Sequence, residues 1–398
     1  MKVLLVNPPS PYLDNDAAYP PMGLMYVAAA LEKEGCGVEI IDMAGNRPSP
    51  LYNIDYDLVG FTCVTPNVNI VRSLIETVPS DIPVMVGGAH PTFVPEDALG
   101  YIQIEGEFES VARHIVADVS TGTTDYRYFG LPVLPCDIPI PARHLVDLHR
   151  YKPGGENATP IYTSRGCNFN CAFCSGFSKY RAIPFSNTKA ELAQCVDAGF
   201  NNLVIGDDNF FIDKTHAFEI LDHIRDTYPD IRLRINTDAR GITNEGVRRA
   251  KEAGCVSISM GIESGSQMML ARMNKVATVK KNTESIRIVK EHGIEVKTYF
   301  MVNFPGETEQ TVQATLDFAE KIKPDKWLLS SFAPLPGSDV WDRPEHYGIT
   351  SVSRNWNDYY LVGKGGMFQP SFETAYLTHQ KQTELHDMMF NGLKEVLG

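Results

Sequence analysis

The segment that decides the fold is CNFNCAFC, residues Cys167–Cys174, which places three thiols within eight residues. An apolar, strand-like run at Ile161–Thr163 precedes it, so we expect the segment to form a loop at the carboxyl end of a strand. The other cysteines stand singly, and we expect all of them to be buried small side chains. These are Cys36, Cys63, Cys136, Cys195 and Cys255. Only the three-thiol segment has the spacing of a ligand set.

Composition excludes several classes of protein. The 398 residues are 43% hydrophobic and 21% charged, which is typical of a globular chain with two or three domains. No apolar run approaches the roughly 20 residues of a membrane span, and the N-terminal run MKVLLVN is too short for a secretion signal. We therefore expect a cytoplasmic protein without disulfides. The net charge of −13 argues against general nucleic-acid binding.

Residues 1–125 alternate short apolar runs with helical stretches. The predicted strands are Val3–Val6, Val38–Ile41, Leu58–Thr62, Val84–Val86 and Tyr101–Ile104. The predicted helices are Pro21–Glu34, Asn67–Thr77 and Phe108–Val119. Five short strands separated by helices favour a parallel, doubly wound sheet, so we predict a flavodoxin-like (Rossmann-like) α/β domain.

The ends of these strands are marked by glycine, proline and small polar residues, which would let a flat ligand rest against the backbone. The residues concerned are Pro9, Ser10, Thr62, Thr65, Gly87, Gly88 and His90. No G-x-G-x-x-G motif follows the first strand, so the fingerprint of a dinucleotide site is absent.

Residues 126–158 are rich in proline and are predicted to be a linker. A second alternation fills residues 159–345, and residues 346–398 form a C-terminal extension that ends in a helix near 378–396. The predicted strands of the second alternation are Ile161–Thr163, Asn202–Gly206, Arg232–Asn236, Val256–Gly261, Val296–Val302 and Trp327–Phe332. A complete eight-unit barrel typically needs about 250 residues, so these six units predict a partial (β/α)6 TIM-type barrel with its site at the strand carboxyl ends.

Three thiolates can hold three irons of a cubane cluster and leave the fourth iron open, whereas electron-transfer clusters normally have four cysteines. A structural zinc ion would need a fourth ligand, which His144 or His149 could supply. A disulfide is the third alternative.

The C-x-x-x-C-x-x-C spacing on the first loop of a partial barrel resembles the radical S-adenosylmethionine (SAM) superfamily. The resemblance implies a 4Fe–4S cluster on Cys167, Cys171 and Cys174, with SAM on the open iron. Phe173 resembles the aromatic residue near the adenine, GDDNF at 206–210 the segment that orients the amino group, and Glu263 the ligand of the ribose hydroxyls. The SAM-binding residues predicted in this way are Phe173, Gly206, Asp207, Asp208, Asn236, Ser259, Glu263 and Asn303.

The N-terminal segments VNPPSP, GFTCVTPN, GGAHPTFVPED and IEGEFES resemble the cobalamin-binding domain that precedes many radical SAM domains. The resemblance implies that cobalamin contacts the strand-end residues named above. The D-x-H-x-x-G motif, whose His binds cobalt, is absent. We expect His90 to be a hydrogen-bonding loop residue rather than a cobalt ligand.

The function that the resemblance implies is methylation of an unactivated carbon or phosphorus of a small-molecule substrate, with a 5′-deoxyadenosyl radical and methylcobalamin. An electron donor such as flavodoxin or ferredoxin would be a partner. One alternative is a radical SAM oxidoreductase or cyclase of the anaerobic tetrapyrrole type, and another is a SAM- or cobalamin-binding sensor without turnover. Methylthio transfer to tRNA would need a second cluster and a basic appendage, and neither is evident. No catalytic acid or base is predicted.

Overall fold

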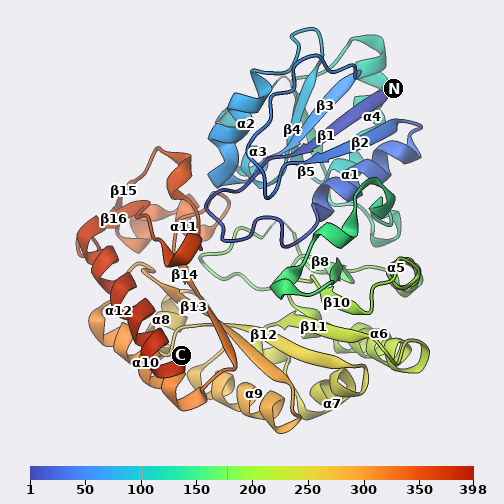
Figure 1. The fold of residues 1–398 in the computed structure, drawn as a ribbon. Coiled ribbons are helices and arrows are strands. Elements are labelled where there is room, and N and C mark those ends of the chain that lie inside the picture. Colours follow the sequence, from blue (N-terminus) through green and yellow to red (C-terminus); the bar gives the residue numbers. More distant parts are fainter. Residues whose placement is uncertain (98, 101, 177) are drawn as a thin grey trace. The chain divides into compact units, whose positions relative to one another are not determined.

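A computed structural model describes residues 1–97, 99–100, 102–176 and 178–398 (Figure 1). The chain divides into two compact units. The first contains Met1–Thr159 together with Asn355–Asn357, and the second contains Pro160–Arg354 and Asp358–Gly398. Each unit has its own sheet.

The first unit is built on a six-stranded sheet with the order β2-β1-β3-β4-β5-β6, in which all neighbours are parallel. Its strands are β1 (Lys2–Asn7), β2 (Gly37–Asp42), β3 (Leu58–Thr62), β4 (Val84–Gly87), β5 (Ile102–Gly106) and β6 (Arg127–Gly130). The order reverses between β1 and β3, which creates the switch point where ligands bind in doubly wound sheets. The flavodoxin-like prediction is confirmed for the first five strands.

Helices cover both faces of this sheet. They are α1 (Met22–Lys33), α2 (Val68–Ile75), α3 (Ala89–Phe93) and α4 (Ala112–Thr121). Val3 and Leu5 of β1 pack in the same core as residues of α1 and α4, while Leu4 and Val6 pack with residues of α2. Because alternate residues of a strand point to opposite faces, burial on both sides explains the continuous apolar run of β1.

Three predictions for this unit need correction. The five-strand prediction was wrong, because β6 pairs with β5 in the segment that was expected to be a linker. The strand predicted from Tyr101 to Ile104 runs from Ile102 to Gly106, and Tyr101 itself lies outside the described residues. Cys136 is exposed rather than buried, because it lies in a short 3-10 turn (Pro135–Asp137) beyond β6.

The second unit contains a six-stranded sheet with the order β14-β13-β12-β11-β10-β7, which follows the chain from one edge to the other. The strands are β7 (Thr159–Ile161), β10 (Asn202–Ile205), β11 (Arg232–Thr237), β12 (Cys255–Glu263), β13 (Glu295–Val302) and β14 (Lys326–Ser331). From β10 to β14 every neighbouring pair is parallel. Across the described residues no pairing joins β14 to β7, so the barrel is open, as predicted for a partial (β/α)6 fold.

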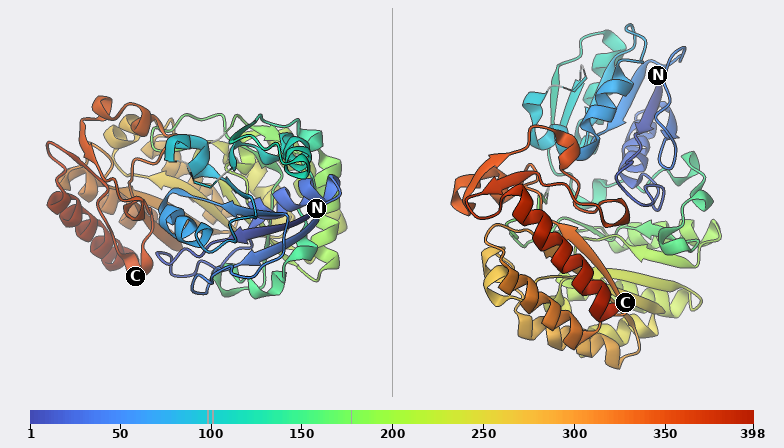
Figure 2. Two further views of the ribbon diagram at one scale, coloured as in Figure 1. Left: turned by 90° about the horizontal axis from the view of Figure 1, so that it is seen from above. Right: turned by 60° about the vertical axis from the view of Figure 1, so that its left-hand side comes forward.

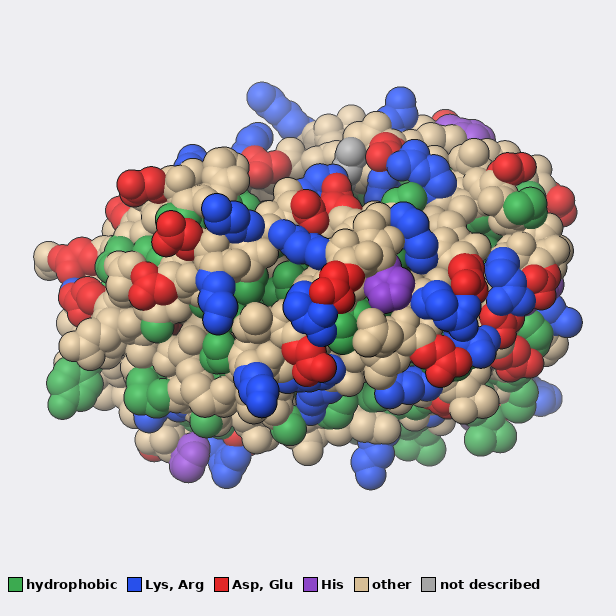
Figure 3. All heavy atoms as spheres, turned by 90° about the horizontal axis from the view of Figure 1, so that it is seen from below, with side chains coloured by type: hydrophobic (Ala, Val, Ile, Leu, Met, Phe, Trp, Pro, Cys, Tyr) green, Lys and Arg blue, Asp and Glu red, His purple; other side chains and the backbone are tan. Residues whose placement is uncertain are grey.

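The helices between these strands are α5 (Phe185–Asp197), α6 (Lys214–Thr227), α7 (Asn244–Glu252), α8 (Gln267–Arg272), α9 (Val279–Glu291) and α10 (Glu309–Ile322). Ion pairs such as Arg249–Asp222 and Arg287–Glu291 lie on α6, α7 and α9. Figure 3 shows acidic and basic side chains interspersed on one face of the molecule.

The C-terminal extension adds α11 (Asp339–Asp342), the antiparallel strands β15 (Ile349–Val352) and β16 (Phe372–Thr374), and the long helix α12 (His379–Leu397). Helix α12 packs against α10 (Figure 2). Gly392 lies at this contact, where a Cβ would be 2.5 Å from Leu316 Cδ1 and would make that side chain shift. Of the helices in the described part of the chain, none is both long and apolar enough to cross a membrane.

Candidate functional site

The cysteine loop is held at its base by a small antiparallel ladder. Strands β8 (Ser164–Arg165) and β9 (Arg181–Ala182) pair on either side of it, and the N–H of Cys167 donates to Ser178 O at 3.2 Å. Gly166 has a φ of +77°, and a Cβ there would lie 2.4 Å from Ser178 O. Only glycine fits this turn without a backbone shift, so the sequence before Cys167 fixes where the loop begins.

The interior of the loop is held by other parts of the second unit. Ala172 donates its N–H to Met273 O at 2.8 Å and accepts the N–H of Val340 at 3.1 Å. The side-chain nitrogen of Asn274 donates to Asn170 O at 2.6 Å. The residues on both sides of Cys171 are therefore anchored to the segment after α8.

All three thiols of the loop are free; Cys174 is exposed, and Cys167 and Cys171 are half-buried. Desolvation raises the pKa of Cys171 to about 11, although the nearby Lys275 acts in the opposite direction. Desolvation also raises the pKa values of Cys167 and Cys174. A metal that binds thiolates would overcome this cost, as coordination deprotonates a thiol outright.

The donor set fits an iron–sulfur cluster better than a single ion. Within the described residues, no three His, Cys, Asp or Glu side chains converge as ligands for one metal ion. His144 is paired with Glu32 at 2.8 Å, and His149 lies 3.4 Å from the amide oxygen of Asn157, so the geometry does not support the zinc alternative. Three sulfur ligands on one loop suit a cubane, because each thiolate binds a different iron.

A buried charge cluster that the sequence analysis missed lies at the ends of β11 and β12. Lys275 Nζ donates to Glu263 Oε1 at 2.9 Å and lies 3.6 Å from Asp238 Oδ2. Asp238 Oδ1 also accepts Arg240 Nε at 2.7 Å, and the Arg240 guanidinium lies 3.4 Å from the ring centroid of Phe169 in the cysteine loop. Burial disfavours the charge on Lys275, but Glu263, Asp238 and Cys171 outweigh this effect and raise its pKa.

The only sequence signals for this cluster were the polar residues of NTDAR, at 236–240, and a lysine twelve positions after Glu263. Neither signal predicts contact. Gly261 makes room for the pair, because a Cβ there would lie 2.4 Å from Glu263 Oε1 and 3.0 Å from Lys275 Nζ.

The residues predicted to bind SAM lie on the cysteine loop and on successive barrel strands or the loops that follow them. Phe173 is half-buried in the cysteine loop, and Gly206 leaves room for Tyr162, whose ring would lie 2.8 Å from a Cβ. Asn236 donates its amide to Ile205 O at 3.3 Å, and Ser259 is buried on β12. Gly206 follows β10, Asn236 lies on β11 and Ser259 on β12, so the structure brings together residues that are far apart in the chain.

Glu263 and Asn303 share an unusual backbone conformation. Their φ angles are +65° and +70°, in the left-handed region that non-glycine residues rarely adopt. Glu263 is the last residue of β12 and Asn303 directly follows the adjacent strand β13, and such outliers gather at functional sites. The Asn303 amide nitrogen donates to Gln382 O of α12 at 3.0 Å, while its side-chain oxygen is buried and has no hydrogen-bond partner among the described residues.

Asp207 and Asp208 differ in environment. Both carboxylate oxygens of Asp207 accept hydrogen bonds, from Thr163 and Ser164, so this side chain joins two loops rather than offering a free carboxylate. Burial raises the pKa of Asp207, and these hydrogen bonds oppose the rise. Asp208 is exposed and lies within electrostatic range of Cys167 and Cys174.

The strand-end loops of the first unit are also connected to one another. Cys63 donates its N–H to Gly87 O at 2.8 Å and accepts the N–H of His90 at 3.1 Å. The Ser10 hydroxyl accepts the Asn67 amide at 3.0 Å. The predicted residues at the ends of β1, β3 and β4 therefore lie on one edge of the sheet. In chain order they are Pro9, Ser10, Thr62, Thr65, Gly87, Gly88 and His90.

His90 has a structural environment. It is fully buried, Nδ1 lies 3.3 Å from Thr65 Oγ1, and Nε2 lies 3.0 Å from Asp97 Oδ2. The Trp356 ring packs edge-on against it at a centroid distance of 4.8 Å. Burial lowers the pKa of His90 despite the neighbouring Asp97. Both ring nitrogens therefore have polar neighbours, and His90 lies in the short helix α3 rather than in a loop.

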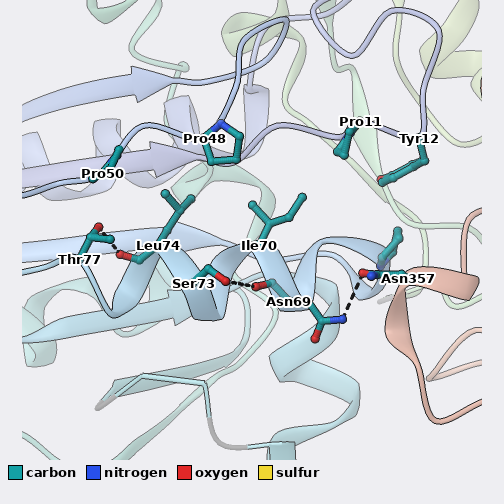
Figure 4. Close-up of a pocket in the computed structure, with 11 residues that line it drawn as sticks. Pro11, Tyr12, Pro48, Pro50, Asn69, Ile70, Ser73, Leu74, Thr77 and Asn357 are labelled. Atoms are coloured by element: carbon teal, nitrogen blue, oxygen red, sulfur yellow. Dashed lines mark hydrogen bonds between the residues drawn. The ribbon is translucent and has the colours of Figure 1, made fainter.

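A pocket of about 670 Å³ lies beside this edge of the first unit, between the segments after β1 and β2 and helix α2 (Figure 4). Prolines and the Ile70 and Leu74 side chains give it a mainly apolar wall. It is lined by Pro11, Tyr12, Pro48, Pro50, Pro66, Asn69, Ile70, Ser73, Leu74, Thr77 and Asn357. Since Pro11 follows Ser10 and Pro66 follows Thr65, the pocket is an apolar extension of the strand-end surface.

The chain combines an open barrel, which carries a three-thiol loop at its catalytic end, with a doubly wound domain. This combination defines an iron–sulfur enzyme that has a separate domain for a second ligand. Comparison with known families agrees: residues 161–319 match the Radical SAM superfamily, and residues 16–116 match the B12 binding domain. The chain therefore contains a radical SAM domain and a B12-binding domain. The predicted cofactors are thus confirmed at the level of these families, as a 4Fe–4S cluster, SAM and cobalamin.

Related proteins extend over most of the chain. An uncharacterized methyltransferase of Pyrococcus horikoshii is 28% identical over 407 residues, covering 91% of this chain and 87% of the relative. An anaerobic magnesium-protoporphyrin IX monomethyl ester cyclase of Rubrivivax gelatinosus is 24% identical over 86% of this chain and 69% of its own. The solved structure of the radical SAM methyltransferase TsrM from Kitasatospora setae, with cobalamin and a 4Fe–4S cluster bound, has a TM-score of 0.71. It is 18% identical and covers 97% of this chain and 90% of its own.

Proposed function

We propose that this enzyme transfers a methyl group from SAM to an unactivated carbon or phosphorus of a small-molecule substrate, with the participation of cobalamin. The observation that carries the proposal is the presence of an open three-thiol loop and a B12-binding domain in one chain. A radical SAM site alone would serve many reactions. The second cofactor restricts the choice, because cobalamin carries methyl groups.

The residues of the second unit would hold the cluster and orient SAM. Cys167, Cys171 and Cys174 supply thiolates, and Glu263 supplies a carboxylate that can accept two ribose hydroxyls. When bound and reduced, the cluster supplies the electron that cleaves SAM to methionine and a 5′-deoxyadenosyl radical. An external donor such as flavodoxin or ferredoxin would deliver that electron. Lys275 fixes the rotamer of Glu263, so the carboxylate is held in place before the ligand arrives.

The first unit would bind cobalamin on the edge formed by the loops after β1, β3 and β4. Gly88 lets the loop after β4 pass close to the backbone of Cys63, and the apolar pocket beside the edge can receive an apolar part of a ligand. His90 contributes by holding the loop and not by a metal bond. The protein's contribution to the chemistry is positioning and exclusion of water.

A cyclase or oxidoreductase of the anaerobic tetrapyrrole type is the second candidate, because one relative has that activity in its name. It would use the same cysteine loop and the same SAM site. A sensor without turnover is disfavoured by the loop itself, since recognition of SAM does not need a cluster with an open iron.

The test uses the full-length protein, purified without oxygen, reconstituted with iron and sulfide, and supplied with cobalamin, SAM and a reductant. A methyltransferase of this type is expected to release S-adenosylhomocysteine as well as 5′-deoxyadenosine. A cyclase would release 5′-deoxyadenosine alone, and a sensor neither product. Absence of S-adenosylhomocysteine in a protein that holds both cofactors and makes 5′-deoxyadenosine would contradict the proposal. Once a substrate is found, the product should gain the mass of one methyl group.

A further inference from the structure

The segment Met273–Lys275 is attached directly to the cysteine loop. Met273 O accepts the N–H of Ala172, and the Asn274 side chain donates to Asn170 O at 2.6 Å. These bonds flank Cys171 on both sides. Asn274 has a φ of +51°, so the chain turns sharply at the residue whose side chain binds the cysteine loop.

The next residue, Lys275, points back into the protein and is buried, with a side chain that is 7% exposed. A buried ammonium is costly unless it is paired. Glu263 and Asp238 supply the pairing, at 2.9 Å and 3.6 Å. Lys275 thus directly follows the two residues that hold the neighbours of Cys171, and its charge opposes the rise in the pKa of that thiol that burial causes.

We propose that Lys275 is a positioning residue that brings a fixed positive charge to the Cys171 corner of the cluster and thereby sets its reduction potential. This inference rests on the proposed function, because it requires a cluster on the three cysteines. Reduction adds one negative charge to the cluster, and a nearby buried cation stabilises the reduced state more than the oxidised state. Glu263 and Asp238 oppose this effect, because both carboxylates pair with Lys275 and partly neutralise its charge.

The experiment is a redox titration of the reconstituted protein, followed by electron paramagnetic resonance of the reduced cluster. K275M removes the charge and keeps most of the volume, and K275R keeps the charge. At a fixed potential, K275M is expected to lower the ratio of reduced to oxidised cluster by roughly tenfold, as the loss of one buried charge that two carboxylates partly neutralise would. K275R should stay close to wild type. D238N should shift the midpoint in the opposite direction, to a more positive potential.

K326M is the matched control, because Lys326 is exposed and begins β14 at the opposite end of the barrel strands. Its midpoint should equal that of wild type. If K275M does not load iron, D238N decides: a more positive midpoint supports the inference and an unchanged one overturns it. Wild-type protein that holds no cluster would overturn the proposed function and this inference together. If the wild-type protein holds a cluster, and neither K275M nor D238N changes the midpoint potential, this inference alone is overturned.

Discussion

Asp207 accepts two hydrogen bonds from Thr163, one from the backbone N–H at 2.7 Å and one from the hydroxyl at 2.6 Å. The Ser164 hydroxyl adds a third at 2.6 Å. The carboxylate is buried, so it joins the loop after β10 to the segment that leads into the cysteine loop. Asp207 belongs to a motif that resembles a SAM-binding segment, but its carboxylate stabilises the backbone around the cysteine loop.

This arrangement predicts that D207N destabilises the protein by about 2–4 kcal/mol, because an amide nitrogen would face hydrogen-bond donors in a buried place. Urea unfolding measures the loss. D230N changes an exposed aspartate of the same unit and should alter stability by less than about 0.5 kcal/mol. Equal stability of D207N and wild type would show that the Asp207 link contributes nothing.

The three cysteines of the loop should be required for binding of iron, and the cysteines elsewhere in the chain should not. C167A, C171A and C174A, singly or together, should each reduce bound iron after reconstitution to less than about a tenth of the wild-type amount, because two thiolates bind a cubane weakly. C195A is the matched control, since Cys195 is buried in α5. Iron analysis and visible absorbance report the outcome. A triple variant that still cleaved SAM would refute the cluster assignment.

Glu307 follows the end of β13 and predicts a pH dependence of stability. Burial raises its pKa to about 7, although Thr311 and backbone N–H groups oppose the rise. In the unfolded chain its pKa is 4.5. Between these pH values the folded protein keeps a proton on Glu307 that the unfolded chain has lost. The free energy of unfolding is therefore highest below pH 4.5 and falls as the pH rises toward 7.

E307Q should remove this dependence. The wild-type protein is expected to lose about 3 kcal/mol, relative to E307Q, as the pH rises from 4.5 to 7. Urea unfolding at several pH values measures the difference between the two proteins. E309Q, at an exposed glutamate two residues further on, controls for the loss of a charge. Parallel pH profiles for wild type and E307Q would contradict the prediction.

The fold could be predicted where burial leaves a pattern in the sequence. Val3–Val6 reads as a strand because both faces are covered, and the same holds for Leu58–Thr62. Strand β6 was missed for the opposite reason. Its residues RYFG bury only Tyr128, and Phe129 is exposed, so an edge strand of this kind resembles a loop in composition.

Some residues of the site could likewise be predicted from the sequence, and others could not. The cysteines and Glu263 follow predicted strands, and the sequence order alone places them at one end of the barrel. The contact of Glu263 with Lys275 depends on the turn at Asn274 and on the space left by Gly261, and neither has a local signature. The attachment of Asn303 to α12 spans 79 residues, so no periodic pattern reports it. Long-range polar contacts of this kind are specified by packing, which a single sequence does not reveal.

Gly88 lies in the strand-end edge of the first unit that we propose as the cobalamin site. Its φ is +112°, and a Cβ would lie 2.7 Å from Cys63 O, whereas a Cβ at Gly23 in α1 meets nothing within 4 Å. G88A should therefore cost about 2–3 kcal/mol of stability, while G23A should gain about 0.5–1 kcal/mol. Because β3 and β4 are joined at this contact, G88A should also weaken cobalamin binding in equilibrium dialysis. Iron loading on the cysteines of the second unit should be unchanged. If G88A bound cobalamin as tightly as G23A, the edge formed by these loops could not be the corrin site.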